Sequence, residues 1–249
     1  MCKRLPVFND QPQTADDLEA EPFRVDVAFG FDCFSDDFKV LRIEYDAINH
    51  VQPVTVRGVY LYTLKSDMWK EIIVGVTLPS FVCYAFCPVL ISGPVVDGVL
   101  YLEGMNEMVT FDLHNEVFGL IEFPSFVQRR KSNVFNFQGS VAVFAEELIT
   151  DDDGSSSEII SLWTMAAASD KVFWNKAFTI DPGLEVDWVF EHFGAKQFLG
   201  RDKLGETVHD FGNKKTKAIE FPSQSFLVKA LKHSESFLSI EGFKQIKED

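Results

Sequence analysis

The chain has 249 residues, of which 46% are hydrophobic, 24% are charged and 25 are phenylalanines. This aromatic and apolar content excludes an intrinsically disordered protein, because disordered chains are poor in both kinds of residue. The formal net charge of −15 argues against nucleic acid and anionic membranes as partners, since both are recognised by clustered Lys and Arg. A basic protein partner is compatible with it.

The cysteines and the absence of targeting signals indicate a reducing compartment. Four cysteines are too few and too scattered for a disulfide framework. The first eight residues lack the apolar core of a secretory signal peptide. Residues 78–96 carry no charge and are long enough to cross a membrane, but three prolines and a glycine interrupt them and favour two buried strands. We expect a soluble protein of the cytoplasm or nucleus.

The chain opens with an acidic segment and a first pair of strands. Asp10–Pro22 is acidic and has no apolar periodicity, so we expect it to be exposed. Val25–Phe31 and Phe38–Ile43 read as two strands. Between them, Asp36 and Asp37 could be read as a carboxylate pair for acid–base chemistry. A polar turn in which an Asp bonds the backbone is the better interpretation.

Four later segments repeat one pattern, in which a strand, a short polar turn and a second strand follow each other as in a β-hairpin. They span residues 59–72, 109–121, 160–178 and, as a weaker copy, 207–219. Trp69, Phe118 and Trp174 fall at matching points, 49 and 56 residues apart. An aromatic residue that recurs once per unit is expected to pack between adjacent units.

Further strand pairs lie between these hairpins. They cover residues 95–102, with an Asp-Gly turn, residues 134–144 around Gly139, and residues 189–200 around Gly194. A unit of about fifty residues therefore holds about four strands, which is the size of a kelch-type propeller blade. The sequence predicts an all-β, kelch-like β-propeller of four-stranded blades.

Catalytic and metal-binding patterns are weak. The sequence has no G-x-S-x-G, no H-E-x-x-H and no glycine-rich phosphate loop. Its five histidines are dispersed. Asp151–Asp153 lacks the ligand spacing of an EF-hand. We therefore expect no catalytic residue, no metal and no cofactor, and we expect that the protein is not an enzyme.

Several of these segments resemble the F-box associated domain of plant F-box proteins, including the S-locus F-box-like group. The first is Phe29–Asp32 followed by Ser35–Val40, where the family has a Gly, an aromatic, Asp and then Asp-aromatic-Lys-Val. The others, in the family's order, are Val59–Trp69, Asp97–Tyr101, Val109–Leu113 with Phe118–Pro124, and Ile160–Met165 with Trp174–Lys176. The resemblance covers roughly residues 4–230.

The resemblance implies a protein-interaction domain that recognises the substrate in an SCF-type, cullin-based E3 ubiquitin ligase. In such ligases the F-box binds a Skp-type adaptor, which joins it to the cullin, and the associated domain binds the target. We expect that the F-box itself is absent from this chain, so adaptor and cullin would be partners only if an upstream F-box is present. The alternatives are an enzymatic or ligand-binding propeller of the galactose-oxidase kind and a non-functional fragment of an F-box protein.

The resemblance also sets expectations for domain limits and partner-binding residues. We expect the end of a first hairpin and an acidic loop over residues 1–24, the propeller over 25–232 and a tail over 233–249. The ring would be incomplete at the N-terminus, with Arg4–Val7 and Phe226–Leu231 as candidate closing strands. The target would be a protein, and a basic one would meet the acidic side chains of the first loop. The candidate partner-binding residues are Asp16, Asp17, Glu19 and Glu21.

Overall fold

The structure is a computed structural model, and within its described part every regular element is a β-strand. The described residues are 5–6, 8, 23–46, 56–74, 93–103, 107–123, 134–150, 154, 156–168, 171–180, 188–193, 197–202, 205–210, 212–213 and 215–219. Among them, no helix exists that is long and apolar enough to cross a membrane. The expectation of an all-β fold is confirmed.

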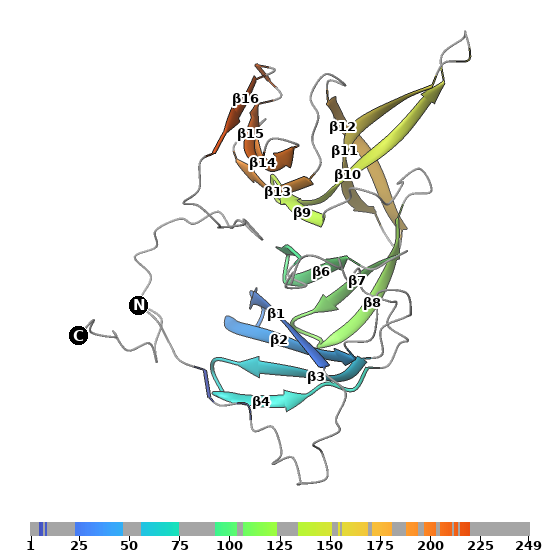
Figure 1. Ribbon diagram of the computed structural model, residues 1–249. Coiled ribbons are helices and arrows are strands. Elements are labelled where there is room, and N and C mark those ends of the chain that lie inside the picture. Colours follow the sequence, from blue (N-terminus) through green and yellow to red (C-terminus); the bar gives the residue numbers. More distant parts are fainter. Residues whose placement is uncertain are drawn as a thin grey trace, which may run out of the picture.

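Sixteen described strands form four antiparallel sheets, each of four strands in sequence order (Figure 1). We call these sheets blades 1 to 4. Blade 1 holds β1 (Phe23–Asp32), β2 (Asp37–Asp46), β3 (Val56–Thr63) and β4 (Met68–Glu71). Blade 2 holds β5 (Val95–Val96), β6 (Val99–Glu103), β7 (Glu107–Asp112) and β8 (Val117–Glu122). Blade 3 holds β9 (Val134–Phe137), β10 (Ser140–Thr150), β11 (Ser156–Ala168) and β12 (Lys171–Ile180). Blade 4 holds β13 (Trp188–Phe193), β14 (Gln197–Asp202), β15 (Gly205–Asp210) and β16 (Lys215–Ala218).

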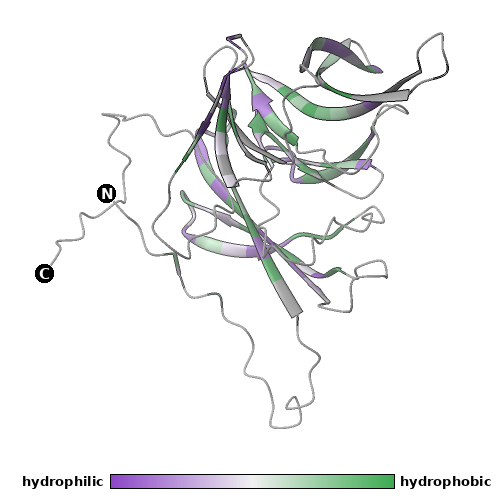
Figure 2. Ribbon diagram, turned by 45° about the horizontal axis from the view of Figure 1, so that its top comes forward, coloured by the Kyte–Doolittle hydropathy of each residue, from purple (hydrophilic) through white to green (hydrophobic). Residues whose placement is uncertain are grey.

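The hydrophobic core lies between successive blades. One buried cluster joins blades 1 and 2 through side chains such as Leu41, Leu61 and Phe111. Two smaller clusters join blades 2 and 3, and a phenylalanine-rich cluster joins blades 3 and 4, where Phe198 stacks on Phe137. Hydrophobic residues accordingly recur along the strands of the whole array (Figure 2). Alternate residues of each strand face one neighbouring layer, which is the period that the sequence shows.

The turns match the signals in the sequence. Asp36, Asp67 and Glu116 each end a four-residue hairpin turn with a positive φ of 52°, 55° and 58°. The β5–β6 turn has positive φ at both central residues, Asp97 and Gly98, which is the geometry of a type I′ turn. All four repeated hairpins are present where the sequence predicts them, as β3–β4, β7–β8, β11–β12 and β15–β16.

The recurring aromatic residues do not all pack in the same way. Phe118 and Trp174 pack against the clusters that join neighbouring blades, as expected. Trp69 instead contacts the N-terminal segment, since its ring lies 5.4 Å from that of Phe8 and its Nε1 donates to the Pro6 carbonyl at 3.4 Å. The described contacts of Trp69 are thus with the N-terminal segment and not with another described blade, and its packing between blades stays a prediction.

The closing strands fall largely outside the described residues. Of Arg4–Val7, the structure describes Leu5 and Pro6, and neither is in a strand. Phe226–Leu231 lies wholly outside the described residues, as does most of the uncharged stretch 78–96. The closure of the ring therefore stays a prediction.

Candidate functional site

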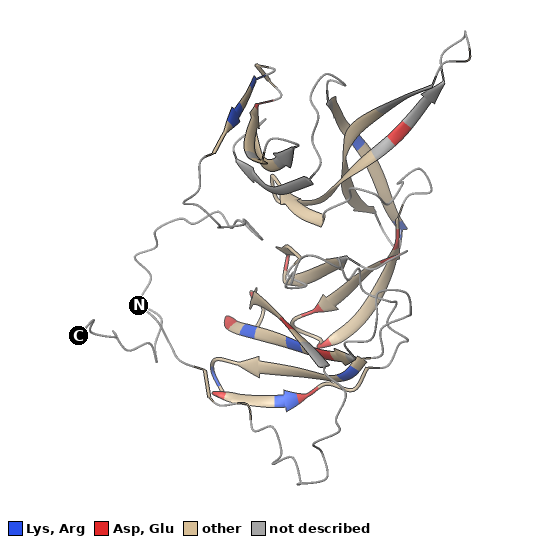
Figure 3. Cartoon of the chain, in the orientation of Figure 1, with Lys and Arg blue, Asp and Glu red and all other residues tan. Residues whose placement is uncertain are grey.

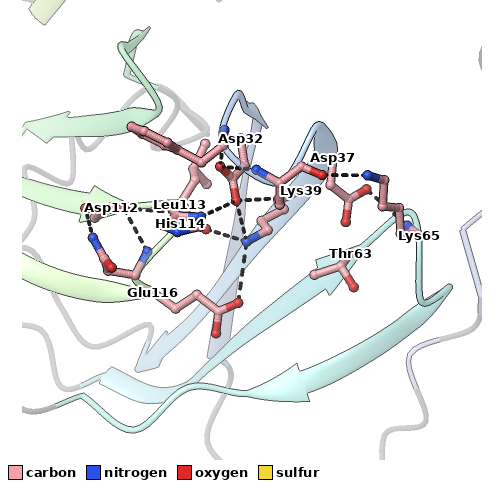
Figure 4. Close-up of polar contacts among 12 residues, drawn as sticks. Asp32, Asp37, Lys39, Thr63, Lys65, Asp112, Leu113, His114 and Glu116 are labelled. Atoms are coloured by element: carbon pink, nitrogen blue, oxygen red, sulfur yellow. Dashed lines mark hydrogen bonds and ion pairs between the residues drawn. The ribbon is translucent and has the colours of Figure 1, made fainter.

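Four turns gather at one end of blades 1 and 2, and we call this region the turn end. Figure 4 shows the contacts that join three of them. The turn end consists of residues 33–36, 64–67, 97–98 and 113–116. The backbone N–H of Leu113 donates to the Gly98 carbonyl at 3.0 Å, which ties two of the turns together within blade 2. The links between the two blades run through side chains.

Lys39 is the central link between the blades. It is only 4% exposed, although it carries a charge. Its ammonium lies 3.0 Å from an Asp32 carboxylate oxygen, donates to the Leu113 carbonyl at 2.5 Å and lies 3.5 Å from Glu116 Oε1. Because Leu113 and Glu116 belong to the β7–β8 turn, this one side chain fastens blade 1 to blade 2.

Asp32 is the acceptor that matches Lys39. Its carboxylate is fully buried and accepts hydrogen bonds from the N–H groups of Phe34 and Ser35, at 3.0 and 3.2 Å, and from the Ser35 hydroxyl at 2.6 Å. Burial by itself raises the pKa of Asp32, but the hydrogen bonds from Ser35, Lys39 and Phe34 outweigh it and hold the pKa well below its usual range. The carboxylate is therefore charged at neutral pH and fixes the β1–β2 turn.

The neighbouring turns are held in the same manner. Asp37 accepts the backbone N–H of Lys65 at 3.0 Å, and the Lys65 ammonium donates to the Ser35 carbonyl at 2.5 Å. Asp37 is the first residue of β2 and bonds the backbone of the β3–β4 turn, whereas Asp32 bonds the backbone of the β1–β2 turn. Asp36 sits beside Asp37 as the exposed residue with positive φ.

In blade 2, Asp112 caps its own turn. It accepts the N–H groups of His114 and Asn115 at 2.8 and 2.9 Å, and the Asn115 side-chain amide at 2.8 Å. Burial raises the pKa of Asp112, whereas these hydrogen bonds lower it by more, so the net direction is downward. His114 then lies between the blades, with its Nδ1 3.4 Å from Asp32 and its ring 5.0 Å from that of Phe34.

Comparison with known proteins identifies the family to which the sequence belongs. The sequence matches the F-box associated beta propeller domain over residues 9–195. The chain belongs to this family. The match spans blades 1 to 3 and β13, and Asp32, Asp37 and Lys39, which build the turn end, lie in the segments that carry the resemblance. No curated protein matches the sequence.

The surface that this F-box associated domain displays at the turn end is centred on an aromatic side chain. Phe34 is 74% exposed although its backbone is fixed by Asp32. Acidic and basic residues are interspersed over blade 1 (Figure 3). A large aromatic residue on a rigid support is the kind of group that contributes most to protein–protein binding, because little conformational entropy is lost on contact. The arrangement is suited to binding a protein.

The described histidines are not brought together. The side chains of His114 and His209 lie in blade 2 and blade 4, and His209 is buried between the hydroxyls of Thr207, at 2.7 Å, and Thr216, at 3.0 Å. In the part of the chain that the structure describes, no three His, Cys, Asp or Glu side chains lie close enough to hold a metal ion.

The residues expected to bind a partner lie outside the described residues. They are Asp16, Asp17, Glu19 and Glu21.

The sequence analysis does not predict the role of Lys39, although the sequence contains a signal for it. Lys39 alternates with Leu41 and Ile43, which puts its side chain on the buried face of β2. A lysine on such a face needs an acidic partner.

Proposed function

We propose that this F-box associated domain is the substrate-recognition part of an SCF-type E3 ubiquitin ligase and that the turn end contacts the target protein. Family membership over residues 9–195 is the observation that carries the proposal. The exposed Phe34, held on a turn that a buried ion pair fixes, supports the location. The Skp-type adaptor and the cullin would join through an F-box upstream of the domain.

In this role the domain supplies affinity and orientation, whereas the chemistry belongs to other subunits. Holding a target so that its lysines lie near a ubiquitin-loaded enzyme converts an encounter in solution into an effectively intramolecular reaction. The network of Lys39 and Asp32 contributes by keeping the contact surface in one conformation before binding. Ubiquitin ligases of this class act in the cytoplasm and nucleus, where we place the protein.

The acidic segment before β1 is a second candidate contact in the same function. With a net charge of −15, the chain would attract a basic target over a distance and raise the association rate. Exchanging Asp16, Asp17, Glu19 and Glu21 together for Asn and Gln should slow association and weaken its salt dependence. An unchanged association rate in stopped-flow measurements would remove these residues from the site.

Reconstitution tests the proposed function. The chain fused behind an F-box should recover adaptor and cullin from plant extract together with a target that the assembled ligase ubiquitylates in vitro. The chain alone should recover only the target. Phe34→Ser should weaken target capture, whereas Phe173→Ser, at a half-exposed aromatic of blade 3, should not.

Two results would contradict the proposal. Capture of adaptor and cullin without any protein that becomes ubiquitylated would argue for the non-functional alternative. Capture of a ubiquitylated target equally by the wild type and Phe34→Ser would move the contact surface away from the turn end.

A further inference from the structure

Blade 3 carries a two-stranded extension that the other blades lack among the described residues. β10 and β11 have 11 and 13 residues, and the other described strands have at most 10. β9 pairs with β10 only along Ser140–Val143, and β12 pairs with β11 only from Ile160 onward. Beyond those points β10 and β11 pair with each other, up to Thr150 opposite Ser156. We call Glu146–Thr150 with Ser156–Ile159 the arm, and it projects away from the blades (Figure 1).

Both strand edges of the arm lack a neighbouring strand in the described structure, and the edge of β10 is the longer of the two. From Phe144 to Thr150, β10 is paired with β11 on one side and with no described strand on the other. The N–H and C=O groups that point to such an edge are a template for an added strand. Extended peptides bind to sheet edges by strand addition, in which main-chain hydrogen bonds supply the affinity.

The root of the arm is braced, so the edge is held in place. Glu147 accepts the Trp163 Nε1–H at 3.1 Å and the Lys176 ammonium at 2.6 Å, and this ammonium lies 5.1 Å from the centre of the Trp163 ring. Burial raises the pKa of Glu147, but the hydrogen bonds from Lys176, Ser161 and Trp163 lower it by more. The carboxylate therefore stays charged, and the brace persists at neutral pH. A braced edge loses less conformational entropy on binding than a mobile one.

Charge indicates the chemistry of the occupant. Residues 140–160 contain no Lys or Arg, and their acidic residues are Glu146, Glu147, Asp151, Asp152, Asp153 and Glu158. Lys176, the cation that the structure places beside this region, already pairs with Glu147. An approaching segment rich in Lys or Arg would be attracted, and an acidic one would be repelled.

We propose that the free edge of β10 in the arm binds an extended, Lys- or Arg-rich segment of the target protein by strand addition. This inference rests on the proposed function, because it names a second contact and the chemistry of the target. Blade 3 would hold the basic segment while the turn end of blades 1 and 2 contacts another part of the target. Two linked contacts raise the overall affinity through effective concentration.

A short peptide probes the edge directly. A fluorescein-labelled peptide of five Lys-Thr repeats should bind the full chain, as measured by fluorescence anisotropy. A peptide of five Glu-Thr repeats should not bind. A Lys-Thr peptide that is methylated at every backbone nitrogen should bind much more weakly, because it keeps the charge but lacks the N–H groups that strand pairing needs. Equal binding of the two lysine peptides would overturn strand addition, and so would no binding of the Lys-Thr peptide.

Variants of the arm locate the binding. Replacing residues 148–158 by Asn-Gly joins Glu147 to Ile159, which are cross-strand partners, and keeps the brace. The Lys-Thr peptide should then lose affinity by about tenfold or more. The double variant Glu146→Gln with Glu158→Gln should weaken binding without shortening the arm, which keeps the test decisive if the shorter chain fails to fold. The matched control is Glu71→Gln with Glu122→Gln, at exposed positions of blades 1 and 2.

The outcomes separate this inference from the proposed function. If the arm variants bind the peptide like the wild type, the edge is only protected from aggregation by its charge, and the inference is wrong. A target that is still captured and ubiquitylated would then leave the proposed function intact. If the peptide binds through the arm but the assembled ligase modifies no target, the proposed function fails while the edge site stands as a site for basic peptides.

Discussion

Lys39 illustrates how much one side chain can determine at the residue scale. Exchanging it for Met would leave the Asp32 carboxylate buried without its cation. Removing one partner of a buried ion pair typically costs about 3–5 kcal/mol, so Lys39→Met should lower the free energy of unfolding by that amount. Urea titration followed by tryptophan fluorescence measures it. The control is Lys70→Met, at a half-exposed side chain that pairs with Glu116, and it should cost less than about 1 kcal/mol. Equal losses in both variants would contradict the buried Lys39–Asp32 ion pair.

The hydrogen-bonded carboxylates of Asp32 and Asp112 also predict a pH dependence. The pKa values of Asp32 and Asp112 are lowered by folding from an ordinary value of 3.8. Such groups add stability that is complete above the unfolded-state pKa and is lost as the pH falls through the folded-state pKa. The free energy of unfolding should therefore decrease from about pH 5 downward. Asp32→Asn should show a shallower decrease in urea titrations at several pH values, whereas an identical slope would mean that Asp32 does not contribute.

At the residue scale, the sequence predicts roles that depend on neighbours in the chain. The polar turn between the first two strands is predicted correctly, and Asp36 lies in it with a positive φ. Asp37 instead begins β2 and bonds the Lys65 N–H of the next turn. The Lys39 contact with Leu113 joins residues 74 positions apart, and periodicity cannot show which distant turn faces a buried lysine. The acidic residues of the first loop stay a prediction.

At the scale of elements, the two tryptophans of the β11–β12 hairpin differ in the partner of their indole N–H. Trp163 donates to Glu147, whereas the buried Nε1 of Trp174 has no acceptor in the described structure. A buried donor without a partner costs about 1–3 kcal/mol. Trp174→Phe should therefore change the free energy of unfolding by less than about 1 kcal/mol, because removing the unpaired N–H offsets the loss of packing. Trp163→Phe should destabilise more, since it leaves Glu147 without one donor, and chemical denaturation followed by circular dichroism compares the two.

The hairpins are the elements that the sequence predicts best, because their turns have a local chemical cause. Asp210 accepts the N–H and the side-chain amide of Asn213 at 2.9 and 3.0 Å, as Asp112 does with Asn115. The weaker fourth copy thus keeps the same turn. Its second strand, β16, has Thr216 in place of an aromatic residue. The Thr216 hydroxyl bonds His209, which lies opposite it on β15.

The arm is the element that the sequence leaves unpredicted. The strand patterns there end at Phe144 and resume at Ile160. The structure extends both strands to Thr150 and Ser156. Acidic and small residues have low strand propensity, and pairing with a neighbouring strand outweighs that preference.

At the scale of the whole molecule, the contact between blades 1 and 2 depends on Gly30. A Cβ at this position would lie 2.6 Å from Leu113 Cδ1 and 2.9 Å from Val95 Cγ2. Leu113 is buried and Val95 is stiff about χ1, so neither side chain can move away freely. Gly30→Ala should therefore overpack the contact and lower the free energy of unfolding by about 1–3 kcal/mol. Gly119→Ala is the control, because its close neighbour is the end of the Thr110 side chain, which can rotate away. Equal stability of Gly30→Ala and the wild type in urea titration would show that the blades are loosely packed.

The propeller architecture is predictable because its cause is a period in the sequence. Strand pairs recur about every fifty residues, and the structure turns each set of four strands into one blade. The contacts between blades are not predictable in the same way, because they depend on which faces meet. The limits of the propeller at residues 25 and 232 also stay a prediction, since the described strands end at Ala218.

Because each described sheet takes its four strands from one continuous stretch of chain, no blade in the described structure has to wait for a distant segment before it pairs. Chains with local contacts fold faster than chains whose pairings span long separations, and domains tend to fold from the N-terminus during synthesis. Blade 1 can therefore assemble on the ribosome while blade 4 is still being translated. Lys39 of blade 1 can bond Leu113 and Glu116 only after the β7–β8 turn has left the ribosome. The order of translation would therefore set the order in which the blades join.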